Sequence, residues 1–250
     1  MDCSDNNITE LNVGNNVKLV YLSCSENPLV ELDISNNTEL KTLFCDNIAL
    51  DELNTNNNLL LENLACSNCQ LSELDLSHNT NLLRLECDDN HLSNLDVSHN
   101  VALEALWCQS NELQELDLSH NKNLKELHCT NNPLGELDVS NLVDLEYLSC
   151  GNLGLTELDV SNNQSLLYLY CFDELGNLDV SNNRMLQELL CTFCGLENLD
   201  VSNNTELERL DCTGNYIDEL DVSNNPNLVY IGCEESTSII GYAGEQIYRK

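Results

Sequence analysis

Cysteine is the residue type in this chain with the greatest capacity for chemistry, and it recurs at a fixed spacing. The 250 residues include 14 cysteines, a number that suggests disulfides in a secreted protein or metal sites in a cytosolic one. Twelve of them follow one another at intervals of 20 or 21 residues. These twelve are Cys3, Cys24, Cys45, Cys66, Cys87, Cys108, Cys129, Cys150, Cys171, Cys191, Cys212 and Cys233.

Such a short fixed period predicts a solenoid, in which each coil buries its apolar residues by stacking on its neighbours. At the strand spacing of about 4.8 Å the twelve cysteines would form one column. Each would have a like neighbour above and below, so no pair is singled out. Side chains that point the same way also suit the disulfide dihedral poorly. We therefore expect buried thiols that act as small apolar residues.

Two CxxC matches, Cys66/Cys69 and Cys191/Cys194, resemble a zinc pair or a redox motif. Cys69 and Cys194 occupy a position of the repeat where most coils have asparagine, which favours a structural role. The two pairs are six coils apart, about 29 Å at strand spacing, and cannot share a metal ion. No nucleophile, base and orienting acid recur at a usable spacing. The sequence predicts no enzyme, cofactor or metal site, with a hydrolase as the remote alternative.

Histidines at 21-residue spacing are the second candidate for chemistry. His78, His99 and His120 could form a row that binds a transition metal, because imidazole is a common ligand. Asparagine and histidine both tolerate positive φ, so we predict left-handed turn residues, with the metal row as the alternative. The rest of the column is Asn15, Asn36, Asn57, Asn141, Asn162, Asn182, Asn203 and Asn224.

A third column is acidic. Stacked carboxylates repel one another, and either Ca²⁺ or hydrogen bonds from turn donors would relieve the repulsion. A serine two residues later, such as Ser98 or Ser119, offers a local donor, so we favour the structural explanation over calcium. The column consists of Asp33, Asp75, Asp96, Asp117, Asp138, Asp159, Asp179, Asp200 and Asp221, with Asn12 and Asn54.

The net charge limits the partners. Asp+Glu 43 against Lys+Arg 9 gives a formal charge of -34, which repels nucleic-acid phosphates and anionic lipids and favours cations or basic partners. No apolar run approaches the ~20 residues of a membrane helix, and the N-terminal residues show no signal-peptide pattern. We expect no nucleic-acid partner and no direct membrane insertion.

The repeat unit is L-x-x-L-x-C-x-x-N-x-L-x-x-L-D-V-S-x-N-x-x. Alternation in L-x-C predicts a short strand, and the following asparagine can satisfy backbone groups at a turn. The second half of the unit is too short for two turns, a crossing and a helix. We predict a leucine-rich repeat solenoid, mainly parallel β, with short strands or turns on the convex side, few or no helices and modest curvature. Residues 1–233 would form about eleven 21-residue coils, and residues 234–250 a C-terminal cap.

The first half of the unit is the leucine-rich repeat signature, with cysteine where many families have leucine or valine. The chain resembles bacterial leucine-rich repeat proteins of the nested 21-residue IRREKO subclass and is similar to the cysteine-ladder internalins of Gram-positive cell surfaces. The resemblance implies a non-enzymatic binding scaffold for a protein, or for a glycan, in bacterial surface adhesion or host contact. It would be secreted or at the cell surface. A cytoplasmic protein-interaction module is the alternative.

Aromatic residues gather in the middle of the repeat array, although aromatics are 5% of the chain. They coincide with a coil that lacks one residue between Cys171 and Leu178, which should disturb the stacking and leave a local hollow. Large aromatics are common interface anchors, so we predict a ligand-binding site for a protein partner that is basic or glycosylated, on a monomeric chain. Its residues are Trp107, His128, Tyr147, Tyr168, Tyr170 and Phe172.

Overall fold

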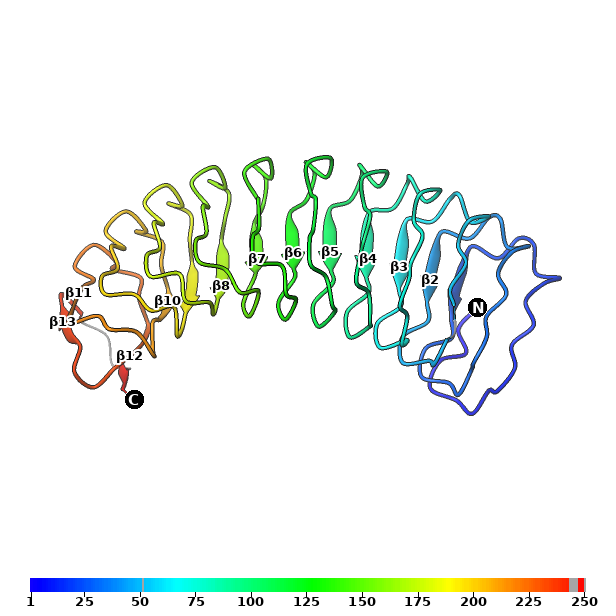
Figure 1. Cartoon of the computed structure of the whole chain (residues 1–250), viewed down its shortest axis with the longest axis horizontal. Coiled ribbons are helices and arrows are strands. Elements are labelled where there is room, and N and C mark those ends of the chain that lie inside the picture. Colours follow the sequence, from blue (N-terminus) through cyan, green and yellow to red (C-terminus); the bar gives the residue numbers. More distant parts are fainter. Residues whose placement is uncertain (51, 243–246, 250) are drawn as a thin grey trace. The chain divides into compact units, whose positions relative to one another are not determined.

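The computed structural model describes residues 1–50, 52–242 and 247–249. The chain divides into two compact units, Met1–Leu124 and Lys125–Lys250. Both consist of short parallel strands that are joined by turns (Figure 1).

The N-terminal unit contains five strands that pair in chain order, all parallel and in register. Equivalent residues pair along the sheet, so that Leu43 lies beside Leu64 and Leu85 beside Leu106. The strands are β1 (Tyr21–Ser23), β2 (Thr42–Phe44), β3 (Asn63–Ala65), β4 (Arg84–Glu86) and β5 (Ala105–Trp107).

The C-terminal unit continues the same pattern from β6 to β10 and then adds β12 and β14 to the parallel sheet. Two strands, β11 and β13, pair with each other in a small second sheet. The strands are β6 (Glu126–His128), β7 (Tyr147–Ser149), β8 (Tyr168–Cys171), β9 (Glu188–Cys191), β10 (Arg209–Asp211), β11 (Glu219–Asp221), β12 (Tyr230–Cys233), β13 (Ser238–Ile240) and β14 (Ile247–Arg249).

Alternation explains why each strand has one buried and one open face. In β5, Leu106 and the following Cys108 have no exposed surface, whereas Trp107 between them is partly exposed. Of the twelve cysteines of the column, eleven are buried, and Cys3 in the first coil is partly exposed. All fourteen cysteines are thiols in the structure. The predicted buried cysteine column is confirmed.

Asparagine closes the turn after β1, β4, β5, β6 and β10. Asn111 donates from Nδ2 to the carbonyls of Cys87 (3.0 Å) and Cys108 (3.1 Å), and its Oδ1 accepts from the Leu92 N–H (3.0 Å). One side chain therefore satisfies backbone groups of its own coil and of the preceding coil. Such groups would otherwise be buried without partners, which costs free energy.

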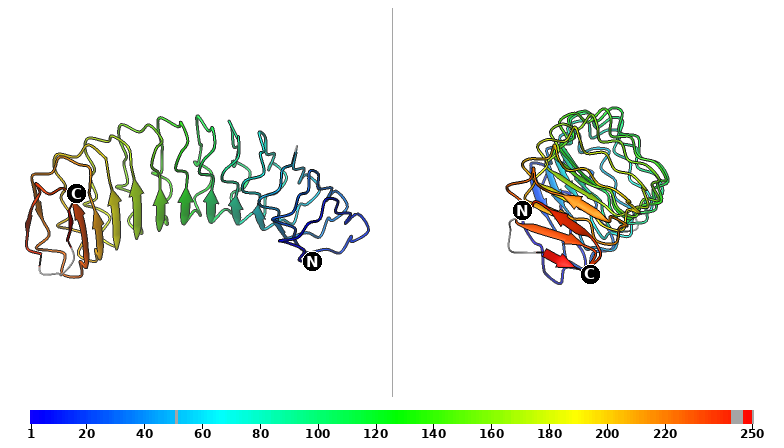
Figure 2. Two further views of the ribbon diagram at one scale, coloured as in Figure 1. Left: turned by 90° about the horizontal axis from the view of Figure 1, so that it is seen from below. Right: turned by 90° about the vertical axis from the view of Figure 1, so that its left-hand side faces the viewer.

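The second half of each repeat is made of turns rather than helix. The Asn100 N–H donates to the Val97 carbonyl (3.0 Å), and the Leu103 N–H donates to the Asn100 carbonyl (3.1 Å). Figure 2 shows the strands on one side of the coils and these turns away from them. The described residues form no helix, and none of them offers a helix that could span a membrane. The parallel-β solenoid predicted from the repeat is confirmed.

The predicted positive φ of the histidine column is wrong. His78 is the third residue of a turn that the Asn79 N–H closes on the Leu76 carbonyl (3.0 Å), and neither His78 nor His99 nor His120 is among the described non-glycine residues with positive φ. The side chain instead lies beside Ser77, whose Oγ is 3.1 Å from Nδ1 of His78. His99 and His120 lie in the same way beside their preceding serines.

Positive φ occurs instead two residues after most cysteines of the column, where the chain leaves the strand. The next residue is the one that closes the turn, as Asn111 does after Cys108, and we call this position the ladder asparagine and the column cysteine the ladder cysteine. The positions with positive φ are Asp5, Glu26, Asn47, Asn68, Asp89, Ser110, Asn131, Asn152, Phe193 and Gly214.

The one-residue deletion falls on this left-handed position. Phe172 follows Cys171, and Asp173 comes directly after it in place of the ladder asparagine. The Asp173 carboxylate is buried and accepts from the N–H groups of Leu153 (3.1 Å) and Gly154 (2.9 Å). β8 and β9 stay in register through Cys171 and Cys191. The shortened turn absorbs the deletion. The predicted disturbance of the strand stacking is therefore wrong.

The C-terminal segment adds strands rather than another full repeat. β13 pairs with β11 through Leu220 and Ile239, and β14 pairs with β12 through Ile231 and Ile247. Residues 243–246 and 250 of the predicted cap 234–250 lie outside the described residues. The domain limits at residue 233 remain a prediction.

Candidate functional site

The sheet face of the C-terminal unit brings four of the predicted site residues together. Parallel pairing places Tyr147 on β7 directly beside Tyr168 on β8. Tyr170 lies two residues further along β8 and therefore points to the same face. His128 on β6 occupies the row of Tyr170, with Ser149 between them. All four side chains are partly exposed.

The rings of these residues pack against one another. His128 stacks on Tyr147 with ring centroids 4.4 Å apart and an interplanar angle of 21°. Tyr147 also meets Tyr168 at 5.7 Å and the edge of Tyr170 at 5.1 Å, where the planes make 82°. These separations are typical of favourable aromatic pairs. Tyr147 is thus the centre of a cluster, which we call the tyrosine cluster: His128, Tyr147, Tyr168 and Tyr170.

Carboxylates border the tyrosine cluster at both ends of its row. Glu126 pairs with Tyr147 across the sheet and lies 3.0 Å from Nε2 of His128. Glu188 on β9 pairs with Tyr168. Burial and the Glu188 carboxylate raise the pKa of Tyr170 well above its usual value, and burial raises the pKa of Tyr147. Both phenols therefore stay neutral at physiological pH.

Phe172 does not join the cluster through a ring contact among the described residues. It lies after the end of β8, and its ring covers Gly151 of the preceding coil. A Cβ atom at Gly151 would collide with that ring. Phe172 therefore packs on its neighbouring coil, which is possible because residue 151 has no side chain.

Trp107 belongs to the N-terminal unit and has a different environment. The Arg84 guanidinium lies 4.2 Å from the centroid of its ring, and Arg84 Nε is held by Glu86 at 2.6 Å. Trp107 is therefore already part of a cation–π contact within the chain.

Sequence reasoning missed a second aromatic group, at the C-terminal end of the same sheet face. Tyr230 on β12 stacks on Tyr248 with centroids 4.9 Å apart, and the Arg209 guanidinium lies 4.6 Å from the Tyr230 ring. The signal was available, because Tyr230 stands three residues before its cysteine, as Tyr147 and Tyr168 do.

The additional cysteines act within the frame of the repeat. Cys69 Sγ lies 2.9 Å from the Cys45 carbonyl oxygen, and Cys194 Sγ lies 3.4 Å from the Cys171 carbonyl oxygen. These are the carbonyls that a ladder asparagine would bind, which supports the structural explanation of both CxxC matches. Within the described part of the chain, no group of three or more His, Cys, Asp or Glu side chains could hold a metal ion.

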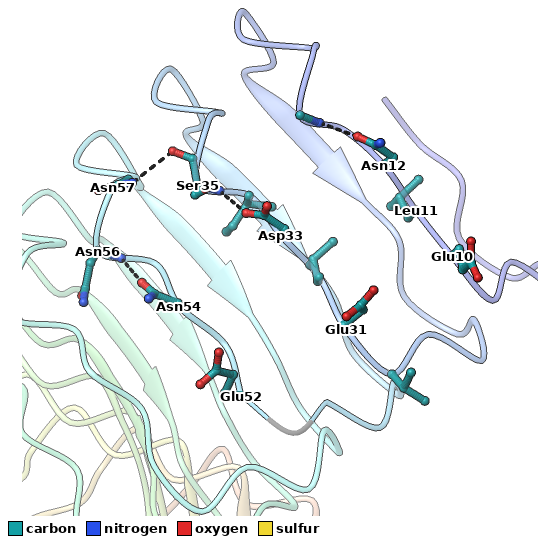
Figure 3. A pocket seen from close by; sticks show the side chains of 14 residues that line it. Glu10, Leu11, Asn12, Glu31, Asp33, Ser35, Glu52, Asn54, Asn56 and Asn57 are labelled. Atoms are coloured by element: carbon teal, nitrogen blue, oxygen red, sulfur yellow. Dashed lines mark hydrogen bonds between the residues drawn. The ribbon is translucent and has the colours of Figure 1, made fainter.

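The acidic column is held by local hydrogen bonds. The Ser119 N–H donates to Oδ1 of Asp117 (2.9 Å), and the same bond recurs at Asp96 (2.9 Å) and Asp33 (3.0 Å). Hydrogen bonding by the serine side chain and by the serine N–H lowers the pKa of these aspartates. Figure 3 shows the column at its N-terminal end, where Asn12 and Asn54 accept the same bond as Asp33.

The column also borders an open hollow of about 850 Å³ in the N-terminal unit. Glu10, Glu31 and Glu52 form a parallel row on its wall (Figure 3).

Solved structures of the same fold cover nearly the whole chain. The functional domain of InlJ from Listeria monocytogenes, which includes a cysteine ladder, is 33% identical with a TM-score of 0.67, over 96% of this chain and 63% of that one. The internalin InlF of the same species is 20% identical with a TM-score of 0.79, over 96% of this chain and 72% of that one. A leucine-rich repeat protein of Leptospira interrogans is also 20% identical, with a TM-score of 0.80, over 100% of this chain and 77% of that one.

The chain thus spans less than two thirds of the InlJ structure, and the two likenesses at 20% identity show the fold alone. No protein-family model matches the chain, and no curated protein does. The 21-residue spacing, the parallel strands and the buried cysteines are nevertheless those that the repeat predicted. The chain is a leucine-rich repeat protein, and it is similar to the internalins whose repeats carry a cysteine ladder.

Proposed function

We propose that this protein is a non-catalytic binding scaffold whose C-terminal unit holds a protein partner on its sheet face, at the tyrosine cluster. The observation that carries the proposal is the ring contact network of Tyr147 with His128, Tyr168 and Tyr170. Clustered rings on an open sheet are already ordered by one another, so a partner that covers them gains buried area with little loss of side-chain entropy.

The structural neighbours support the same kind of function. Likeness to InlJ and to InlF places the chain among leucine-rich repeat scaffolds, and the proposed setting is bacterial surface adhesion or host contact by a secreted or surface-bound protein. The charge of -34 favours a partner with a basic surface. Glycan on the partner would add contacts to the same rings, because sugar faces pack on aromatic side chains.

The test is a binding screen of the full chain against purified bacterial and host surface proteins. For a partner found in this way, the double substitution Tyr168→Ala/Tyr170→Ala should weaken binding by at least about thirtyfold, because two anchors are worth about 2 kcal/mol or more together. The melting temperature should change little, since all these rings are partly exposed.

The matched control removes two aromatic residues of the same unit outside the sheet face. Phe193→Ala/Tyr216→Ala changes side chains that are 62% and 74% exposed, and it should leave binding unchanged. Equal loss of binding in both double variants, or full binding by Tyr168→Ala/Tyr170→Ala, would place the interface elsewhere on the chain.

A further inference from the structure

Two arginines of the chain lie on the sheet face, and each contacts one aromatic ring and one carboxylate. In the C-terminal unit, Arg209 lies over the Tyr230 ring at 4.6 Å and forms an ion pair with Glu188 at 3.4 Å. In the N-terminal unit, Arg84 lies over the Trp107 ring at 4.2 Å and bonds Glu86 at 2.6 Å. An aromatic face and a carboxylate therefore form a recurring guanidinium site on this fold.

The order of residues across the strands explains the C-terminal arginine site. Glu188, Arg209 and Tyr230 are consecutive members of one row, because β9 pairs with β10 and β10 pairs with β12. Neighbouring strands are about 4.8 Å apart, so a side chain in the middle of the row reaches the carboxylate on one side and the ring on the other.

The tyrosine cluster has the same components without an arginine of the chain. Along the same row, Glu126 is followed by Tyr147, Tyr168 and then Glu188. Two rings are thus bracketed by two carboxylates, and Tyr170 adds its edge from the adjacent row. Glu188 Oε1 lies 3.4 Å from Arg209 and Glu126 Oε1 lies 3.0 Å from His128, so the second oxygen of each carboxylate is the acceptor for an incoming group. Among the described residues, no lysine or arginine lies over the rings of Tyr147, Tyr168 and Tyr170.

We propose that the tyrosine cluster, with Glu126 and Glu188 at its ends, is a recognition site for an arginine side chain of the protein partner. This inference rests on the proposed function and gives the chemistry of its contact. The incoming guanidinium lies on the rings of Tyr147 and Tyr168 in the way that Arg209 lies on Tyr230, and a flanking carboxylate accepts its N–H groups.

Arginine fits this site better than lysine for two reasons. The guanidinium is planar, so it stacks on a ring while an N–H group at its edge donates to a carboxylate oxygen. It is also hydrated more weakly than an ammonium group, which lowers the cost of covering it with a partly buried ring cluster. The surplus of negative charge on the chain adds attraction for either cation, so the experiment must separate attraction from recognition.

The probe is a set of blocked pentapeptides, acetyl-Gly-Ser-X-Ser-Gly-amide, in which X is arginine, lysine or citrulline. Citrulline has the shape of arginine but no charge. Each peptide is titrated into the full chain at about 0.15 M salt, where exposed charges are screened beyond about 8 Å, and the tyrosine ring signals are followed by NMR. The arginine peptide should shift the signals of Tyr147, Tyr168 and Tyr170 and bind at least about tenfold more tightly than the citrulline peptide.

Substitutions locate the site. Tyr170→Ala and Glu188→Gln should each weaken the arginine peptide severalfold, whereas Tyr170→Phe keeps the ring and should bind nearly as the parent does. Tyr216→Ala and Glu157→Gln are the matched controls, because they make the same chemical changes at exposed positions outside the sheet face. Neither control should change binding.

Three results would overturn the inference: equal binding of the arginine and citrulline peptides, unchanged binding by Tyr170→Ala, or an equal loss with Glu157→Gln and Glu188→Gln. The last would show attraction by net charge alone. A partner that depends on Tyr168 and Tyr170 but tolerates replacement of every arginine in its interface would sustain the proposed function and reject the arginine site. Specific binding of the arginine peptide, together with a partner whose affinity does not change in Tyr168→Ala/Tyr170→Ala, would support the arginine site and reject the proposed function.

Discussion

The hydroxyl of Thr55 donates to Oδ1 of Asn79 across 2.7 Å, and both side chains are fully buried. Asn79 lies in the second half of its repeat, where a second row of asparagines runs through the coils. Members of this second asparagine ladder donate from Nδ2 to two carbonyls of the preceding coil. In eight other members the buried Oδ1 has no hydrogen-bond partner in the structure, and the position equivalent to Thr55 is valine, isoleucine or leucine. These eight are Asn37, Asn58, Asn100, Asn121, Asn163, Asn183, Asn204 and Asn225.

A threonine at the equivalent position should therefore be tolerated where a buried hydroxyl is normally harmful. Val180 stands to Asn204 as Thr55 stands to Asn79, since the Asn204 Nδ2 donates to the Val180 carbonyl. Replacing a buried valine by threonine costs about 1–3 kcal/mol when the hydroxyl lacks a partner. Val180→Thr should change the free energy of unfolding by less than about 0.5 kcal/mol or raise it, because the new bond contributes about 1 kcal/mol. Denaturant titration measures this, and a loss above about 1 kcal/mol would contradict the expected bond.

The asparagine ladder also predicts opposite effects for the same substitution at two cysteines three residues apart. Residue 69 is equivalent to Asn90 of the next coil, whose amide binds the carbonyls of Cys66 and Cys87. Cys69→Asn therefore adds an amide that can make the corresponding bonds in its own coil, so the free energy of unfolding should stay constant or rise by about 1 kcal/mol. Cys66→Asn puts the amide in the apolar cysteine column and should lower it by roughly 2–4 kcal/mol. Thermal and chemical unfolding of the two variants compares them directly. Similar losses at both sites would count against a ladder role for Cys69.

Stability should fall at alkaline pH because of the buried thiols. Burial raises the pKa of Cys108 from an ordinary value of 9.0 to about 12, and the pKa values of Cys66 and Cys87 lie well above 9.0. The unfolded chain releases these protons from about pH 9 while the folded chain retains them. The stabilisation is therefore complete below pH 9 and is lost as the pH rises toward 12.

The measurement is the free energy of unfolding between pH 8 and 11. Each buried thiol contributes a slope of about 1.4 kcal/mol per pH unit above its unfolded pKa, and Cys108→Ala should reduce the slope by that amount. A slope that does not differ between Cys108→Ala and the parent chain would show that Cys108 ionises in the folded state. Thiol labelling at pH 8 gives a second check, since partly exposed Cys3 should react before the others.

The acidic column should tolerate asparagine better than alanine. Asp117 accepts the Ser119 N–H, and Asn12 and Asn54 make the same bond naturally. Asp117→Asn keeps an acceptor and removes one charge from a repelling row, so the melting temperature should hold or rise. Asp117→Ala removes the acceptor and should lower it. The difference should persist at high salt, because it depends on the hydrogen bond rather than on screened charge. A higher melting temperature for Asp117→Ala than for Asp117→Asn would show that the hydrogen-bond acceptor does not stabilise the turn.

Gly151 and Phe172 should be coupled. The Cβ atom in Gly151→Ala would collide with the Phe172 ring, and such overpacking costs about 1–3 kcal/mol. The collision is absent in Gly151→Ala/Phe172→Ala, so the double variant should be destabilised by less than the sum of the two single variants. A thermodynamic cycle of the four proteins gives the coupling. Strict additivity would mean that the ring moves away without cost.

Periodic features could be derived from the sequence because equivalent positions in successive coils require the same kind of side chain. The spacing of Cys87, Cys108 and Cys129 was sufficient to predict stacked parallel strands and a buried cysteine column, and the short second half of the unit predicted the absence of long helices. In a solenoid each residue contacts its equivalents in the adjacent coils, so a pattern along the sequence is also a pattern in space. For the same reason the sequence alone places Tyr147 and Tyr168 side by side.

Tertiary structure decided what depends on local backbone geometry and on side-chain rotamers. Asparagine and histidine suit both a left-handed residue and the third position of a four-residue turn, so composition alone assigned positive φ to His99 and missed it at Ser110. The shortened coil is absorbed at the turn before Asp173 because its carboxylate accepts the Leu153 N–H, as the ladder amides accept those of Cys69 and Cys194, and also accepts the Gly154 N–H. The stacking of His128 on Tyr147 and the packing of Phe172 on Gly151 depend on rotamers, which spacing does not fix.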